Sequence, residues 1–235
     1  MRGRLLKNLS TKSLGKIFLE LFLIFIGVLS ALGVENYRES VADRKKEIEY
    51  LVAFKGALQS DTATINLELV KCYQKLKAAS RLLELIENPS QRTEDIEDLV
   101  SSIIMLIDPL FNTAIYEDIK SSGNLRLITN VELRNIIIQH YVAVNNLMER
   151  QKSAIGETSY NVLFTDHLDF NEFTFEKEMD AYDIINRLKK SDTAIQYLRR
   201  LEQKSVTLRN SLLFNALPNA LNLLEKVDLE IRNLN

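Results

Sequence analysis

Few residues of this chain combine a reactive side chain with a spacing that supports chemistry. The sequence holds two histidines and one cysteine, Cys72, and it contains no Gly-rich phosphate loop, nucleophile elbow, HExxH or CxxC pattern. His140 precedes Tyr141 on an apolar helical segment, which indicates a core or edge histidine rather than a general base. Cys72 falls on an apolar face and is expected to be a buried structural thiol. We therefore predict a protein without catalytic activity and without a cofactor.

Acidic residues gather within residues 155–180, with three phenylalanines among them. Because these acids surround His167, a Ca²⁺ or other metal site is one hypothesis, although neither EF-hand spacing nor another ligand motif is present. The favoured interpretation is a connection between helices that is anchored by its aromatic side chains. The acids and phenylalanines of this stretch are Asp166, Asp169, Phe170, Glu172, Phe173, Phe175, Glu176, Glu178 and Asp180.

A single carboxylate, Glu20, lies inside the most apolar stretch of the sequence. At about 100° per residue, Glu20, Gly27 and Ala31 fall on one stripe of a helix. Gly27 and Ala31 form a small-xxx-small pair that lets two helices approach closely in lipid, and a carboxylate in a membrane span usually faces protein or water. Three roles remain open for Glu20: pairing with Lys16, association between helices, and proton or ion handling.

The apolar stretch itself, residues 17–34, is predicted to be a transmembrane helix. Its eighteen residues contain no charge besides Glu20, and a helix of that length covers about 27 Å of a bilayer core that is about 30 Å thick. A cleaved signal peptide is the alternative, since Ala31-Leu32-Gly33 imitates a cleavage site. The length of the apolar run and the helical pattern beyond Val34 favour an uncleaved anchor.

Basic residues indicate the orientation of this span. Five Lys or Arg residues and no acid precede it in the basic tail, residues 1–16, whereas the four bases that follow it are mixed with acids. The positive-inside rule counts only the bases and so favours a cytoplasmic N-terminus. We expect a single-pass protein of the inner (cytoplasmic) membrane whose helical domain, residues 35–235, is extracytoplasmic.

Composition excludes several classes of protein. Seven glycines and three prolines among 235 residues are too few for a collagen-like chain, a flexible linker or a sandwich of many tight turns. The apolar content of 46% excludes global disorder, and a net charge of −2 argues against nucleic acid as a partner. The predicted fold class is all-α: an N-terminal transmembrane helix followed by an antiparallel bundle of long helices.

Apolar residues at helical spacing outline the elements of that bundle. The predicted helices begin near Glu35, Thr93, Thr113, Thr129, Ala181 and Ser191, and the first three end near Asn88, Ile107 and Ser122. Thr129-x-x-Glu132 has the spacing of a capping box. Bases at 199–209 are assigned to a solvated face.

The last long helix has the heptad spacing of a coiled coil, interrupted at Pro218. Its predicted apolar face comprises Ala194, Leu198, Leu201, Ser205, Leu208, Leu212, Leu221, Leu224, Val227 and Ile231.

A turn near the middle of the chain is the second candidate site. Gly123 is expected to close a helix in the left-handed conformation, and Asn124 can hydrogen-bond the turn locally. Lys120 and Arg126 flank it. We interpret these four residues as a buried polar lock at a corner between helices, with a corner that binds a small ligand or a partner as the alternative.

Two stretches together resemble an uncharacterised family of single-pass bacterial membrane proteins. They are FLELFLIFIGVLSALGVENYRES, residues 18–40, and AIYEDIKSSGNLRLITNVELRNIIIQHY, residues 114–141. Typical members have Trp where this chain has Tyr37, so an aromatic residue remains at the membrane exit. The resemblance implies a helical, membrane-anchored protein and supplies no activity, cofactor or catalytic residue.

The leading functional prediction is a membrane-anchored interaction or assembly module, with the lipid bilayer and a second copy or another membrane protein as its partners. One alternative is a subunit of an oligomeric channel or ion-coupled complex that uses Glu20. The other is a sensory bundle that binds a small ligand.

Overall fold

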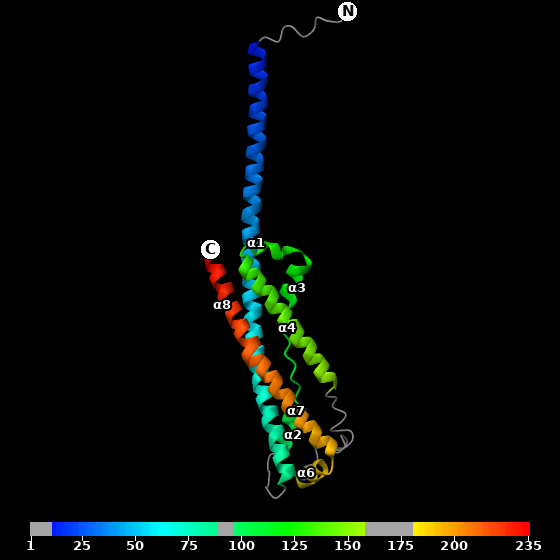
Figure 1. The fold of residues 1–235 in the computed structure, drawn as a ribbon. Coiled ribbons are helices and arrows are strands. Elements are labelled where there is room, and N and C mark those ends of the chain that lie inside the picture. Colours follow the sequence, from blue (N-terminus) through cyan, green and yellow to red (C-terminus); the bar gives the residue numbers. More distant parts are fainter. Residues whose placement is uncertain (1–10, 89–95, 158–180) are drawn as a thin grey trace, which may run out of the picture. The chain divides into compact units, whose positions relative to one another are not determined.

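The regular secondary structure of the described part of the chain is all helical, with no strand, so the all-α prediction is confirmed (Figure 1). The computed structural model describes residues 11–88, 96–157 and 181–235. The hypotheses about the acidic stretch, residues 155–180, rest on side chains at positions 166–180, which lie outside these ranges. The elements are α1 (Thr11–Glu87), α2 (Ile96–Ile104), α3 (Ala114–Ser121), η1 (Asn124–Leu127), α4 (Val131–Glu157), α6 (Ala181–Lys189), α7 (Asp192–Ser211), η2 (Leu212–Ala216) and α8 (Leu217–Leu234).

The chain divides into two compact units, residues 1–49 and residues 50–235. The described residues of the first unit belong to α1, and the second unit contains the rest of α1 and all other helices. No break occurs in α1 between Glu35 and Glu87, as predicted. The helix ends just before Asn88-Pro89, because the residue before a proline disfavours helical backbone angles.

Within the second unit, α7 and α8 run antiparallel to α1. Lys55, early in this part of α1, forms an ion pair with Asp228, late in α8. Ser80, late in α1, donates a hydrogen bond to Glu202 in the middle of α7. Helix α4 also contacts α8, and the two run in opposite directions (Figure 1). The predicted antiparallel bundle is therefore present.

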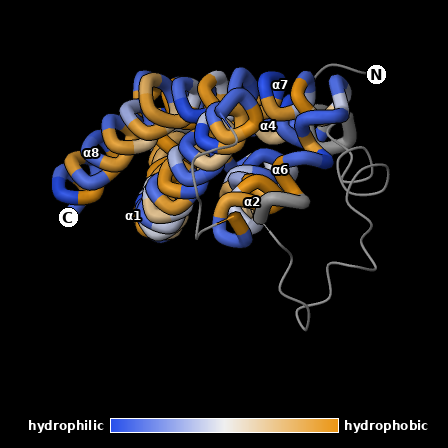
Figure 2. Tube along the Cα trace, turned by 90° about the horizontal axis from the view of Figure 1, so that it is seen from below, coloured by the Kyte–Doolittle hydropathy of each residue, from blue (hydrophilic) through white to orange (hydrophobic). Residues whose placement is uncertain are grey.

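The core of the bundle consists of three apolar clusters, and α1 contributes to each of them. Apolar and hydrophilic residues alternate in bands along α1, α4, α7 and α8, as expected of helices that bury one face (Figure 2). The residues that α1 buries in the three clusters are Leu51, Phe54 and Leu58, then Ile65 and Cys72, then Ala78, Ala79, Leu82, Leu85 and Ile86.

The face predicted for α7 is the face that the structure buries. Ser191 caps this helix as expected, since its hydroxyl accepts a hydrogen bond of 3.1 Å from the backbone N–H of Ala194. The predicted positions that lie buried are Ala194, Leu198, Leu201, Ser205, Leu208 and Leu212.

The face predicted for α8 is wrong by one position at its start. Leu221 is 48% exposed, whereas Ala220 and Leu223 are fully buried. Between α7 and α8 the helix runs on through η2, a π-helical turn in which the backbone N–H of Leu217 donates to the carbonyl of Leu212. Because Pro218 does not interrupt the helix, the buried face of α7 carries on to Ala220 and Leu223, whereas the prediction began a new face at Leu221 after an interruption.

Two helix ends also differ from prediction. The cap of α4 is Asn130, whose side-chain oxygen accepts a hydrogen bond of 3.1 Å from the N–H of Leu133, so α4 begins one residue later than the Thr129 capping box implied. Helix α2 ends at Ile104 instead of Ile107. Ile107 is instead buried in the middle cluster, and its carbonyl accepts a hydrogen bond from the Gln151 side chain.

The exposure of Leu221 and the burial of Leu223 yield a test that separates the two possible faces of α8. Leu223→Ala should lower the free energy of unfolding by about 2–5 kcal/mol, because it leaves a cavity in the core. Leu221→Ala, a matched truncation two residues away, should change it by no more than about 0.5 kcal/mol, as is typical of surface positions. Urea unfolding followed by circular dichroism measures both, and a larger loss for Leu221→Ala would contradict the buried face of α8.

Candidate functional site

The first candidate site is the apolar part of α1, which the structure leaves exposed. Every side chain from Lys16 to Ala42 is exposed. This stretch makes α1 long and apolar enough to cross a membrane. A Cβ atom added at Gly27 would meet no other atom within 4 Å, so the stripe of Glu20, Gly27 and Ala31 faces open space in the single chain.

The pairing of Glu20 with Lys16 is not formed among the described residues. Both side chains are exposed, and the first ion pair along this part of α1 joins Arg38 to Glu35 at 3.6 Å. Outside a bilayer, the lack of this ion pair among the described residues does not choose between the three roles of Glu20, and all three stay open.

The second candidate site, the central turn, has the predicted backbone. Gly123 has φ 73° and ψ 9°, in the left-handed region. Its N–H donates to the carbonyl of Lys120 at 3.2 Å, and the N–H of Ser122 donates to the carbonyl of Asp118 at 3.0 Å. These bonds satisfy the last carbonyls of α3 before η1 begins.

The side chains of this turn do not form the buried polar lock that we predicted. Lys120 is exposed and lies 3.6 Å from Glu117 and over the ring of Tyr116. Arg126 is also exposed. Asn124 is half-buried and makes the one long-range bond, a donation of 2.8 Å to the hydroxyl of Tyr50 on α1. Among the described residues, the amide of Asn124 thus supplies the polar contact of this turn with α1, beside the apolar packing of Ile119 in the cluster that contains Phe54. The two bases reach solvent and do not converge.

Sequence reasoning missed three buried acids of α1, which are Glu47, Asp61 and Glu68. Asp61 is 1% exposed, and one of its oxygens accepts a hydrogen bond of 2.7 Å from the N–H of Asn112. Burial raises the pKa of Asp61, and that hydrogen bond opposes the shift. Glu68 is 3% exposed and accepts a hydrogen bond of 2.7 Å from Lys71. Asp61 thus fixes the segment that leads into α3.

Aromatic rings pack around Tyr141 on α4, close to Asp61. The ring of Tyr141 stacks on that of Tyr116, with centroids 4.7 Å apart, and the imidazole of His140 meets it edge-on at 5.1 Å. Burial raises the pKa of Tyr141, and the charge of Asp61 adds to that shift. Burial also lowers the pKa of His140 to about 4, so this imidazole is neutral at physiological pH. The predicted burial of this histidine is confirmed, but its hydrogen bonding is not satisfied, since Nε2 is buried without a partner among the described residues.

Cys72 is buried, as predicted. Burial raises the pKa of its thiol to about 11, and the nearby charge of Glu68 contributes to the shift. The thiol is therefore protonated near neutral pH and is a poor nucleophile.

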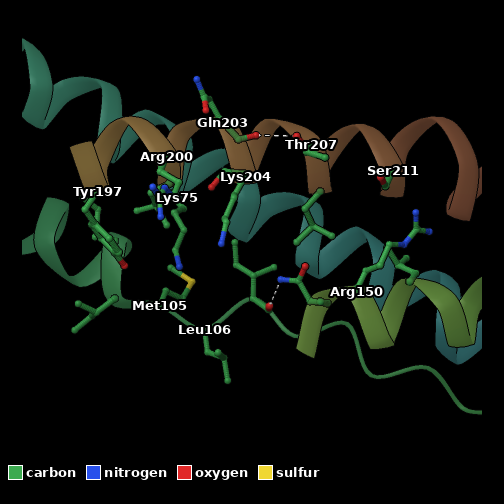
Figure 3. A pocket seen from close by; sticks show the side chains of 18 residues that line it. Lys75, Met105, Leu106, Arg150, Tyr197, Arg200, Gln203, Lys204, Thr207 and Ser211 are labelled. Carbon is green, nitrogen blue, oxygen red and sulfur yellow. Dashed lines mark hydrogen bonds between the residues drawn. The ribbon is translucent and has the colours of Figure 1, made fainter. Parts of the chain in front are cut away.

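A cavity of about 500 Å³ lies in the second unit between α7, the end of α2 and the C-terminal part of α4 (Figure 3). Four bases line it: Lys75 of α1, Arg150 of α4, and Arg200 and Lys204 of α7. We predicted that the bases of α7 lie on a solvated face, but two of them, Arg200 and Lys204, line this cavity. The sequence contains a signal for this lining, since Arg200 and Lys204 are one turn apart beside the buried Leu201.

The turn predicts a specific response to substitution. Gly123→Val should lower the free energy of unfolding by roughly 1–2 kcal/mol, since a β-branched residue is strained at positive φ. Gly56→Ala, at an exposed helical glycine of α1 with open space around it, should instead stabilise the protein by about 0.5–1 kcal/mol. Thermal unfolding compares the two, and an unchanged melting temperature for Gly123→Val would remove the role of the cap.

The buried imidazole predicts a dependence on pH. The unfolded chain binds a proton at His140 near pH 6.5, whereas the folded chain does so only near pH 4, so acidification between these values favours unfolding. The loss of stability from pH 7 to pH 5 should be smaller by about 2 kcal/mol in His140→Gln. The contribution of Asp61 has the opposite sign, but it is common to both proteins. Equal losses in urea unfolding would show that His140 does not titrate in this way.

No family model, no curated protein and no solved structure matches this chain. The resemblance to single-pass bacterial membrane proteins therefore stays a prediction. What the chain does is inferred from its own residues and their geometry.

Proposed function

We propose that this chain is a membrane-anchored helical module that self-associates through its membrane span and has no catalytic activity. The observation that carries the anchor is the uninterrupted exposure of α1 from Lys16 to Ala42. Soluble proteins rarely leave so large a contiguous apolar surface in water, and a helix with these residues satisfies its own backbone in lipid. The basic tail supports a cytoplasmic N-terminus in the inner membrane, with the second unit outside the cytoplasm.

Self-association is supported by the stripe of Glu20, Gly27 and Ala31. Gly27 and Ala31 present almost no side chain, so two copies of this helix can approach closely enough for their backbones to pack. The carboxylate of Glu20, one turn inside the span, gains a polar partner in such a pair instead of facing lipid alone. The proposed partners are the bilayer and a second copy of the chain, or another membrane protein with a similar stripe.

A channel or ion-coupled subunit is the alternative that the same stripe permits. It also places Glu20 beside a neighbouring helix, but it requires a carboxylate that exchanges a proton or an ion. An amide at this position keeps the hydrogen bond and loses the titration, so Glu20→Gln separates the two functions.

Disulfide cross-linking in native membranes tests the interface. Val34→Cys places a thiol at the end of the span, near the stripe, while the native Cys72 is buried and does not compete. Gly27→Leu combined with Ala31→Leu should lower the yield of cross-linked dimer severalfold, because the larger side chains push the helices apart. Gly33→Leu is the matched control, since Gly33 lies about 140° around the helix from the stripe.

Glu20→Gln should leave most of the cross-linked dimer in place, because hydrogen bonds between helices contribute only about 0.6–2 kcal/mol in membranes. Equal yields for the parent protein and the double Leu variant would exclude this stripe as the interface. An intact dimer together with complete loss of an ion flux or proton-coupled activity in Glu20→Gln would favour the ion-coupled alternative.

A further inference from the structure

The cavity of the second unit has the polarity of a site for an amphipathic ligand. Its volume of about 500 Å³ falls within the roughly 300–1,000 Å³ of sites that hold small organic ligands. One wall is apolar and comes from the end of α2 and the residues after it, including Ile103, Ile104 and Ile107. Leu147 of α4 and Leu201 of α7 continue this wall.

The charged groups of the cavity are all of one sign. Lys75, Arg150, Arg200 and Lys204 line it, and no carboxylate does so among the described residues. Lys75 and Lys204 extend from α1 and α7 into the space above Met105, whereas Gln203 points away (Figure 3). Bases from three helices therefore surround one apolar space, although the net charge of the whole chain is −2.

Lys75 is the base of the cavity that a bound anion would stabilise most. Its side chain is partly buried, and no carboxylate of the described residues forms an ion pair with it. Burial lowers the pKa of its ammonium group to about 8, and the neighbouring Cys72 opposes the shift. A buried ammonium group without a counter-ion is costly, so an anion beside Lys75 would be held more strongly than one at an exposed lysine.

We propose that this cavity binds a medium-chain alkyl carboxylate, with its head group at Lys75 and the neighbouring bases and its chain along the apolar wall of α2, α4 and α7. The carboxylate supplies the negative charge that the lining lacks. The alkyl chain removes the apolar wall from water, which is the favourable term for such ligands.

Calorimetric titration with decanoate tests the proposal on the full-length chain in phosphatidylcholine nanodiscs, with empty nanodiscs as the blank for partitioning. We expect saturable binding of one decanoate per chain. Octanoate and hexanoate should bind progressively more weakly, by about three- to fourfold per methylene removed. Decanol and decyltrimethylammonium, which keep the chain and lack the anion, should fail to compete.

Two variants locate the head group. Lys75→Gln should weaken decanoate binding at least tenfold, and so should Arg200→Gln, which replaces an exposed residue and so should leave the fold intact. Lys77→Gln is the matched control, because Lys77 is exposed and lies two residues along the same helix. It should leave binding unchanged.

Proton uptake supplies a second readout. A carboxylate beside Lys75 raises the pKa of this lysine from about 8, so binding at pH 8.5 should take up part of a proton. The observed heat will then vary with the ionisation enthalpy of the buffer, and Lys75→Gln should abolish this variation. The other titratable groups that face the cavity are Arg150 on α4 and Tyr197, Arg200 and Lys204 on α7, while α2 contributes apolar side chains.

The proposal fails if decanoate shows no saturable binding above the nanodisc blank, or if decanol binds as tightly as decanoate. It also fails if Lys75→Gln and Lys77→Gln affect binding equally. None of these results bears on cross-linking of the span, so the two proposals can be judged separately.

Discussion

The bundle depends on the buried face of α1. A single long helix in water has little stability of its own, because most helical stability in proteins comes from packing of an apolar face. Between Leu51 and Ile86, α1 meets this requirement by contributing to all three core clusters. Among the described residues, each of the other helices contributes to at most two of the clusters, so α1 is the element against which their faces are set. The ion pair of Lys55 and Asp228 and the bond of Ser80 and Glu202 then fix the register of α7 and α8 along it.

Buried polar side chains interrupt the apolar face of α1 beside the segment after α2, which is not helical. Asp61 sits between the first two clusters and binds the backbone of Asn112, in a segment that lacks helical hydrogen bonds of its own. The buried group of this pair is the carboxylate of Asp61, and a buried carboxylate without a hydrogen bond is costly, so the bond stabilises both Asp61 and the non-helical segment. This contact holds the segment after α2 against α1, and the same segment carries Ile107 into the core and forms one wall of the cavity.

Local sequence patterns predicted the helices. The errors lie where contacts between residues distant in sequence determine the structure. The heptad of α7 and its Ser191 cap could be read because both depend on residues a few positions apart. The buried face of α8 could not be predicted, because a proline permits a kink, a break or a π turn and the sequence does not distinguish them. Helix α2 ends early because Ile107 gains more from the core formed with α1 and α4, which local spacing does not reveal.

The features of the candidate sites also differ in whether local sequence or contacts between distant residues determine them. The left-handed angle of Gly123 follows from local chemistry, whereas the exposure of Lys120 and Arg126 depends on how the turn meets α1. The cavity has no local signature, because its bases come from three helices that are distant in sequence. Net charge gives no hint of it either, since a nearly neutral chain can concentrate one sign of charge in a small volume. Within such a volume water screens poorly, and the bases of the cavity attract an anion that the surface of the chain as a whole would not.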